Sequence, residues 1–343
     1  MEMRTKSEVL LEQWGTLDLT EIHRRIIGMR DVPFPDVKKC TKLKLPYQAP
    51  SCPPLPSWQE ILAATKTHSL HMLNIGLHPE AETLLFLAEK RPQLRIPTVL
   101  AAWTVMNEYN NPVNCLMMEF IEGIALDDDN FSKLSIQAQD TICAKVSSQL
   151  QYLRELAPEE HYYGRVHRQG WQDPPPAVRG LNHISQDAVG PFDTYEEFAR
   201  AMCQSDESEC AVQDMSPEFH PLSVSHTASL WSMLCNWEPH EPKFTWIDPK
   251  IRNLVVRPVE GDDGNDWEVF LIDWECCGWY PAWLQALQCA HRFRVWLIDR
   301  SSKPPKIWEH REGELVPSVL KDVEPKADLE KLAVMKTRDW HFF

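Results

Sequence analysis

Two carboxylates and one carboxamide occupy positions from which they could hold a metal ion and accept a proton. Asp248 precedes Asn253 by five residues, and Asp273 directly follows an apolar run. The intervening chain reads as two strands, Leu254 to Val256 and Val269 to Ile272, joined by a polar turn. A hairpin would bring Asn253 and Asp273 to one end, with Asp248 on the loop just before them. Such oxygen ligands suit a divalent cation and leave one carboxylate to accept a proton.

The elements that position this window fall into two groups. Before residue 123 the chain predicts a helix over Glu80 to Lys90, then strands over Pro97 to Leu100 and Cys115 to Phe120. Ser57 to Glu60 has the form of a capping box and predicts a further short helix. The opening segment has helical spacing broken at Gly15, and a Pro-rich connector follows it.

After residue 123 the sequence is rich in helix. An apolar stripe predicts a long helix from Ser135 to Leu156, and Thr194 with Glu197 marks the start of another. We therefore expect an α+β fold with a small mixed lobe and a larger helical lobe. The expected divisions are a helical extension and connector over 1–56, a small lobe over 57–122, and a helical lobe over 123–343.

Composition limits the function classes. The net charge of −15 disfavours a nucleic-acid partner and suits a cationic or neutral ligand better than an anionic one. The start lacks the apolar stretch of a secretory signal, and no apolar run is long enough to span a membrane, so a cytoplasmic protein is expected. The ten cysteines include no Cys-x-x-Cys pair, which favours buried thiols over disulfides or zinc.

The catalytic window resembles that of the aminoglycoside phosphotransferase and choline kinase-like families, particularly their fungal members. The resemblance rests on Asp248 followed by Asn253, on Ile272-Asp273-Trp274-Glu275, and on Gly278-Trp279-Tyr280-Pro281. It extends upstream to short segments beginning at Glu80, Ile96, Met118 and Gly190, so that it covers roughly residues 70 to 290. It implies a protein-kinase-like, two-lobed fold.

The resemblance also implies roles for individual residues. Asp248 would be the catalytic base, and Asn253 and Asp273 would hold Mg²⁺ on the phosphates of ATP. Glu80 would lie on the nucleotide side, and the backbone from Glu119 to Ile121 would bind adenine. The implied activity is ATP- and Mg²⁺-dependent phosphorylation of a hydroxyl on a small metabolite, which could bear an amine. Sequence leaves the oligomeric state open.

Several positions depart from the family pattern. Trp246-Ile247 stands where the family has His-Gly before the catalytic Asp, which removes a His that orients the loop. No Gly-rich loop occurs in the first lobe, and Leu70 and His71 stand where a Lys should pair with Glu80, with Lys66 the nearest candidate. These departures keep an alternative open: a pseudokinase that binds a small molecule or catalyses a different reaction without ATP.

Overall fold

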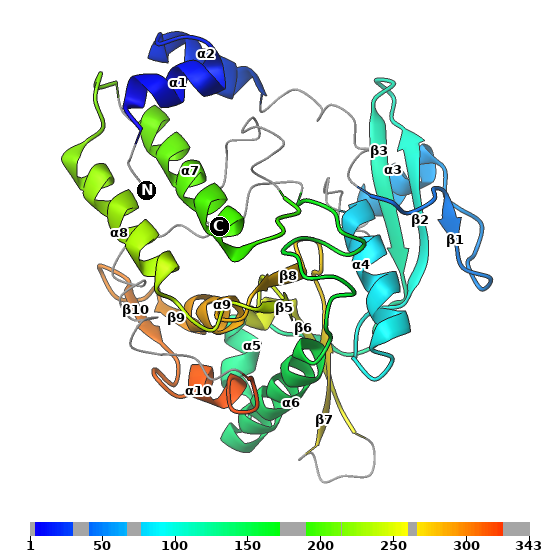
Figure 1. Cartoon of the computed structure of the whole chain (residues 1–343). Coiled ribbons are helices and arrows are strands. Elements are labelled where there is room, and N and C mark those ends of the chain that lie inside the picture. Colours follow the sequence, from blue (N-terminus) through cyan, green and yellow to red (C-terminus); the bar gives the residue numbers. More distant parts are fainter. Residues whose placement is uncertain are drawn as a thin grey trace.

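The computed structural model describes residues 4–29, 41–66, 77–171, 190–213, 215–259 and 266–324. Figure 1 shows a smaller sheet-and-helix part at one side and a larger, mainly helical part beside it. The elements up to residue 118 are α1 (Lys6–Trp14), α2 (Leu19–Met29), β1 (Tyr47–Gln48), α3 (Trp58–Lys66), α4 (Leu77–Lys90), β2 (Val99–Met106) and β3 (Pro112–Met118). The strands form one antiparallel sheet in the order β1-β2-β3, and α4 lies beside it (Figure 1).

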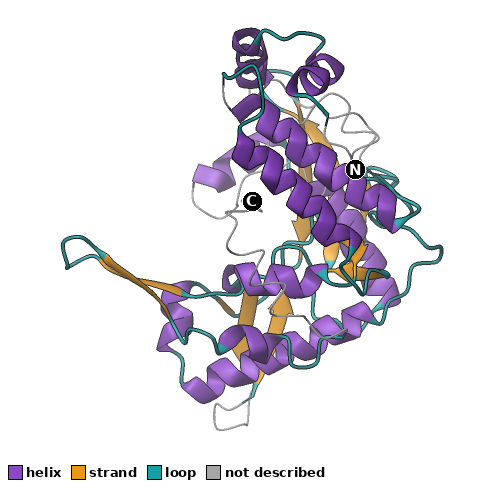
Figure 2. Cartoon of the chain, turned by 60° about the vertical axis from the view of Figure 1, so that its left-hand side comes forward, coloured by secondary structure: helices purple, strands orange, loops and turns teal. Residues whose placement is uncertain are grey.

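The second part begins with β4 and contains three small sheets. Its elements are β4 (Ile124–Ala125), α5 (Asp128–Lys133), α6 (Ile136–Arg154), α7 (Tyr195–Gln213), α8 (Pro221–Cys235), β5 (Pro242–Thr245), a 3₁₀ turn (Ile251–Asn253), β6 (Leu254–Pro258), β7 (Trp267–Leu271), β8 (Gly278–Pro281), α9 (Leu284–Arg292), β9 (Trp296–Asp299), β10 (Lys306–Glu309) and α10 (Leu315–Val319). The sheets are β4-β6-β7, β5-β8 and β9-β10. Figure 2 shows that helices dominate this part and that the β9-β10 hairpin projects from it.

Local sequence signals account for several helix ends. Ser135 caps α6, and its hydroxyl accepts from the N–H of Ala138, as the predicted helix start requires. Thr194 and Glu197 exchange the bonds of a capping box at the start of α7. Gly15 ends α1 with a φ of +67°, in the left-handed region that glycine favours.

Strand ends are less well predicted than helix ends. β2 and β3 extend farther toward their shared turn than expected, because Thr104, Val105 and Met106 pair with Asn114, Val113 and Pro112. The Pro-rich connector contributes β1, whose two residues pair with the edge of β2. Leu70 and Met72 also suggest a strand by their apolar spacing, and both lie outside the described residues.

Most of the core is one apolar cluster that continues from α4 and β2 into the helical part. Four aromatic residues that follow the β6-β7 hairpin belong to it, which fits side chains of this size as core residues rather than as a substrate cage: Trp274, Trp279, Tyr280 and Trp283 are each no more than 4% exposed. A separate cluster joins α1 and α2 to Ala211 of α7. Figure 1 shows the two N-terminal helices at the end of α7, remote from the small sheet.

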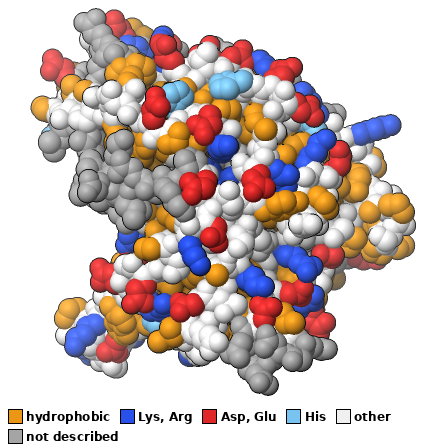
Figure 3. Space-filling model, turned by 60° about the horizontal axis from the view of Figure 1, so that its bottom comes forward, with side chains coloured by type: hydrophobic (Ala, Val, Ile, Leu, Met, Phe, Trp, Pro, Cys, Tyr) orange, Lys and Arg blue, Asp and Glu red, His pale blue; other side chains and the backbone are white. Residues whose placement is uncertain are grey.

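The class of the fold agrees with the mixed helix and strand that the sequence predicts. Of the nine cysteines in the described ranges, six are buried and none is in a disulfide. None of the helices described has both the length and the apolar character needed to cross a bilayer. Acidic and basic side chains are interspersed over the face shown in Figure 3.

Candidate active site

The β6-β7 hairpin brings the three predicted polar residues together. Leu254 pairs with Leu271, and the N–H of Ile272 donates to the carbonyl of Asn253 at 3.0 Å. Asn253 ends the 3₁₀ turn before β6, whereas Asp273 lies just beyond β7. The antiparallel register therefore places these two residues at the same end of the hairpin, as the sequence predicts.

The carboxamide of Asn253 links the two carboxylates. Its Nδ2 donates to the backbone carbonyl of Asp248 at 2.8 Å and lies 3.4 Å from Asp248 Oδ2 and 3.2 Å from Asp273 Oδ2. Within the described residues, Asn253 Oδ1 accepts no hydrogen bond. Asp273 has an exposed side chain and a φ of +66°, a left-handed conformation that Asp tolerates better than most residues. The amide nitrogen of Asn253 thus faces both carboxylates, and the carboxylate of Asp273 is exposed beside it.

Two cationic side chains lie next to the carboxylate of Asp248. Lys250 Nζ is 2.6 Å from Asp248 Oδ2, and Arg292 Nε of α9 is 3.8 Å from Asp248 Oδ1. The Asp248 side chain is 25% exposed, but its Oδ1 is enclosed and accepts no hydrogen bond from the residues described. Lys250 and Arg292 therefore offset the negative charge of Asp248, and its Oδ1 can still accept a hydrogen bond.

Trp246 orients this loop. Its indole Nε1 donates to the carbonyls of Ile272 and Asp273, both at 3.2 Å. Its backbone N–H donates to Gln285 Oε1, and its carbonyl accepts from Gln285 Nε2. The buried indole of Trp246 thus connects the loop before β6 to the turn at Asp273.

Glu80 contacts the same turn from α4. Its Oε1 accepts the backbone N–H of Trp274 at 3.1 Å, and its side chain is buried. Burial raises the pKa of Glu80 to about 7, with smaller contributions from the negative charges of Asp273 and Glu275. No Lys or Arg of the ranges described forms an ion pair with it. The side chain of Lys66, and His71, lie outside the part described.

The segment predicted to bind adenine connects β3 to β4. The N–H of Glu119 donates to the carbonyl of Thr98 at 2.9 Å, which continues the β2-β3 ladder by one bond. Among described residues, neither the Glu119 carbonyl nor the Ile121 N–H has a hydrogen-bond partner. A planar ligand with one donor and one acceptor could use this pair. Phe120, between them, is 91% exposed.

The donor set fits magnesium. Mg²⁺ commonly takes one or two protein carboxylates and keeps several waters and phosphate oxygens as its other ligands. Asp273 offers one exposed carboxylate, and the Asn253 amide oxygen would join it as a ligand if the carboxamide turned its oxygen toward the metal. No group of three or more His, Cys, Asp or Glu side chains suited to a metal occurs in the described ranges, so those ranges hold no site with such ligands from protein alone.

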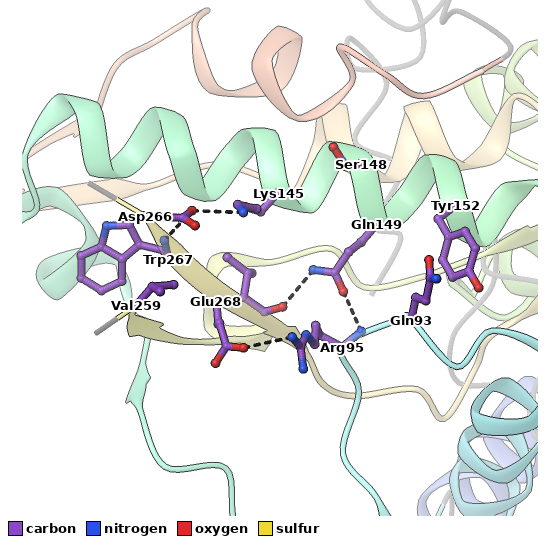
Figure 4. A pocket seen from close by; sticks show the side chains of 11 residues that line it. Gln93, Arg95, Lys145, Ser148, Gln149, Tyr152, Val259, Asp266, Trp267 and Glu268 are labelled. Atoms are coloured by element: carbon purple, nitrogen blue, oxygen red, sulfur yellow. Dashed lines mark hydrogen bonds and ion pairs between the residues drawn. The ribbon is translucent and has the colours of Figure 1, made fainter. Parts of the chain in front are cut away.

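A separate pocket of about 450 Å³ lies between α6 and β7. Figure 4 shows its charged side chains paired across it: Lys145 with Asp266, and Arg95 with Glu268, each at 3.0 Å. Gln149 bridges the backbone of Arg95 and Val269. These contacts join the helix to the hairpin, and the residues of the predicted site do not line this pocket.

Sequence reasoning missed Lys250, Arg292 and Gln285. Lys250 lies two residues after Asp248 and could have been found from that proximity. Arg292 and Gln285 are on α9, more than thirty residues downstream, and no local pattern connects them to the loop.

Comparison with known proteins gives structural neighbours only. No family model and no curated protein sequence matches the chain. The chain is similar in structure to an ADP-bound aminoglycoside phosphotransferase, APH(2'')-Ib, with 15% identity, a TM-score of 0.44, and coverage of 76% of this chain and 70% of that one. A gentamicin complex of APH(2")-IIa gives 14% identity, a TM-score of 0.44, and coverage of 77% and 71%. These enzymes are of the type that the sequence resembles, and a likeness this distant assigns no residue a role.

Proposed function

We propose that the site at Asp248, Asn253 and Asp273 binds Mg²⁺ and ATP and transfers a phosphoryl group to a hydroxyl of a small molecule. The observation that carries this proposal is the Asn253 carboxamide, which lies within 3.4 Å of both carboxylates. This arrangement separates a metal-facing carboxylate from one that can act as a base.

The binding roles follow from the polar groups at the site and at the β3-β4 connection. Asp273 and the Asn253 Oδ1 would hold the metal, and the Glu119 carbonyl with the Ile121 N–H would hold the adenine edge. When bound, Mg²⁺ and ATP supply the transferable phosphoryl group and offset its charge. Every other part of the chemistry falls to the side chains of the loop before β6.

Asp248 would accept the proton of the acceptor hydroxyl as the hydroxyl oxygen attacks. In the described arrangement Lys250 occupies Asp248 Oδ2 and Oδ1 is enclosed, so Lys250 must move before a hydroxyl can reach the carboxylate. Because Lys250 is half-buried on a short loop, its ammonium can turn from the carboxylate toward phosphate oxygens without leaving the site. It would thereby supply a positive charge next to the phosphates.

Lys250 and Arg292 also limit the charge that the acceptor molecule can carry near its reacting hydroxyl. Lys250 and Arg292 flank Asp248, and they would repel an ammonium next to the reacting hydroxyl. We therefore place any amine of the acceptor away from the reacting carbon. The atoms adjacent to the hydroxyl would be neutral or anionic.

A second candidate is a kinase-like fold that binds a small molecule without ATP. The occupation of Asp248 by Lys250 favours it, as does Glu80, which has no cationic partner among the residues described. ADP formation from Mg²⁺-ATP separates the two candidates, with water or a panel of small polyols and hydroxy acids as acceptor. We expect slow hydrolysis that a true acceptor accelerates; no ADP above the level of Asp248→Asn would favour the second candidate.

A further inference from the structure

We infer that Glu80 acts as a positioning residue for Asp273 through the hydrogen bond that its carboxyl oxygen accepts from Trp274. The inference rests on the proposed function, because Asp273 matters as a metal ligand only there. It gives α4 a direct structural role in the site, because the helix itself holds the metal-binding turn.

The contact lies next to the residue that it would position. The Trp274 N–H immediately follows Asp273 and donates to Glu80 Oε1 at 3.1 Å. The left-handed φ of Asp273 makes the chain turn sharply at this residue. Trp246 binds the carbonyls of residues 272 and 273, and the Trp274 indole donates to the Leu271 carbonyl at 2.9 Å. These bonds hold the turn from within the helical part, whereas the Glu80 bond reaches it from α4.

Glu80 acts as a hydrogen-bond acceptor at this contact, and no Lys or Arg of the described ranges forms an ion pair with it. Its carboxyl is buried near the like charges of Asp273 and Glu275, and burial dominates its electrostatics. The bond needs only an oxygen lone pair, which a neutral side chain of the same shape also provides.

α4 is anchored firmly enough for this role. Glu82, two residues along the helix, accepts from Arg165 at 3.1 Å, from Gln169 at 2.9 Å and from Thr41 at 2.9 Å, and both ends of its ion pair are buried. Phe86 contacts Phe244 and Trp279 of the helical part. Because α4 is held at these points, the position of Glu80 relative to the turn at Asp273 is fixed.

The test compares Glu80→Gln, which keeps the acceptor oxygen, with Glu80→Leu, which removes it at similar volume. Hydrogen exchange of the segment around Trp274 in the ligand-free protein is measured first. We expect Glu80→Gln to exchange like the wild type and Glu80→Leu to exchange about tenfold faster there. Binding of Mn²⁺ with a non-hydrolysable ATP analogue is measured next, and we expect it to weaken about tenfold in Glu80→Leu and less than about threefold in Glu80→Gln.

Glu89→Gln is the matched control, because Glu89 is an exposed carboxylate on the same helix. It should change neither measurement. Equal losses in Glu80→Gln and Glu80→Leu would show that charge matters and overturn the inference, as would unchanged exchange near Trp274 in Glu80→Leu. If Glu80→Leu does not fold, Glu80→Met supplies a second side chain without an oxygen. Should the wild type bind no Mn²⁺ with nucleotide, the proposed function fails, while the exchange measurement still decides the role of Glu80.

Discussion

Asp248 has one carboxylate oxygen that could accept a proton and one that Lys250 blocks. Its Oδ1 accepts no hydrogen bond in the described structure, and its Oδ2 is held by Lys250. Under the proposed function, Asp248 would take a proton only after Lys250 moves. If nucleotide binding drives this movement, as the proposed function requires, Asp248 would not activate a hydroxyl before phosphate is present.

Asp248→Asn should lower turnover strongly and leave nucleotide binding nearly unchanged, because the substitution removes a base and not a metal ligand. The expected loss in kcat is about 10²- to 10⁴-fold, the usual contribution of a positioned general base. ADP release and calorimetric titration with Mg²⁺-ATP measure the two properties in parallel. Equal turnover in the variant and the wild type would remove Asp248 from the chemistry.

Glu80 should make the stability depend on pH. Its pKa is raised from an ordinary value of 4.5 to about 7, so the folded state binds the proton more tightly than the unfolded chain does. This contribution to stability is fully present below pH 4.5 and is lost as the pH rises to about 7. A pKa difference of one between the two states corresponds to about 1.4 kcal/mol, so the loss is at most about 3 kcal/mol.

Chemical unfolding without divalent metal, at several pH values across this window, measures the effect in the wild type and in Glu80→Gln. As the pH rises, the unfolding free energy of the wild type should fall relative to that of Glu80→Gln, which carries no titrating group at this position. Parallel curves would show that Glu80 titrates alike in the folded and unfolded states.

At the scale of elements, α4 connects the two parts of the molecule through buried polar contacts. Glu82 and Arg165 form an ion pair with both side chains no more than 3% exposed. The small sheet-and-helix part is therefore tied to the helical part at α4. We expect nucleotide binding to proceed without movement of this helix.

Arg165→Met should lower the free energy of unfolding by about 3–5 kcal/mol, because it leaves a buried carboxylate without its cation. The double variant Arg165→Met with Glu82→Gln should recover part of this loss, since no buried charge then remains. Urea unfolding of both single variants and the double variant completes the cycle. Additive losses would mean that the pair is not coupled.

The elements differ in how far the sequence predicts them. Capping boxes at Ser57 and Thr194 placed helix starts to within a residue, because the signal is local. The β6-β7 register could be predicted from two apolar runs around a polar turn. The contacts of Gln285 and Arg292 could not be predicted, because α9 reaches the loop at Asp248 only through tertiary packing.

At the scale of the whole molecule, the N-terminal helices form a support distant from the proposed chemistry. Arg4 donates to Glu207 of α7 at 2.8 and 2.7 Å, and the Glu207 side chain is fully buried. Burial raises the pKa of Glu207 despite this partner. The Arg4–Glu207 ion pair therefore links the start of α1 to α7, and these two helices also share an apolar cluster.

Arg4→Met should therefore destabilise the fold by about 1–3 kcal/mol, the cost of leaving a buried acceptor unpaired. It should leave the affinity for Mg²⁺-ATP unchanged, because α1 packs on α7 and not on the β6-β7 hairpin. Thermal unfolding and nucleotide titration of the same preparation check both parts. A weaker nucleotide affinity in folded protein would link the N-terminal helices to the site.

The most direct measurement of the central claim is calorimetric titration of the wild type and Asp273→Ala with ATP, each with and without Mg²⁺. Asp273 exposes a carboxylate beside the Asn253 amide, so binding should depend on Mg²⁺ in the wild type. We predict saturable, Mg²⁺-dependent binding that Asp273→Ala abolishes. No heat of binding at saturating Mg²⁺-ATP, or equal affinity in the two proteins, would contradict the account.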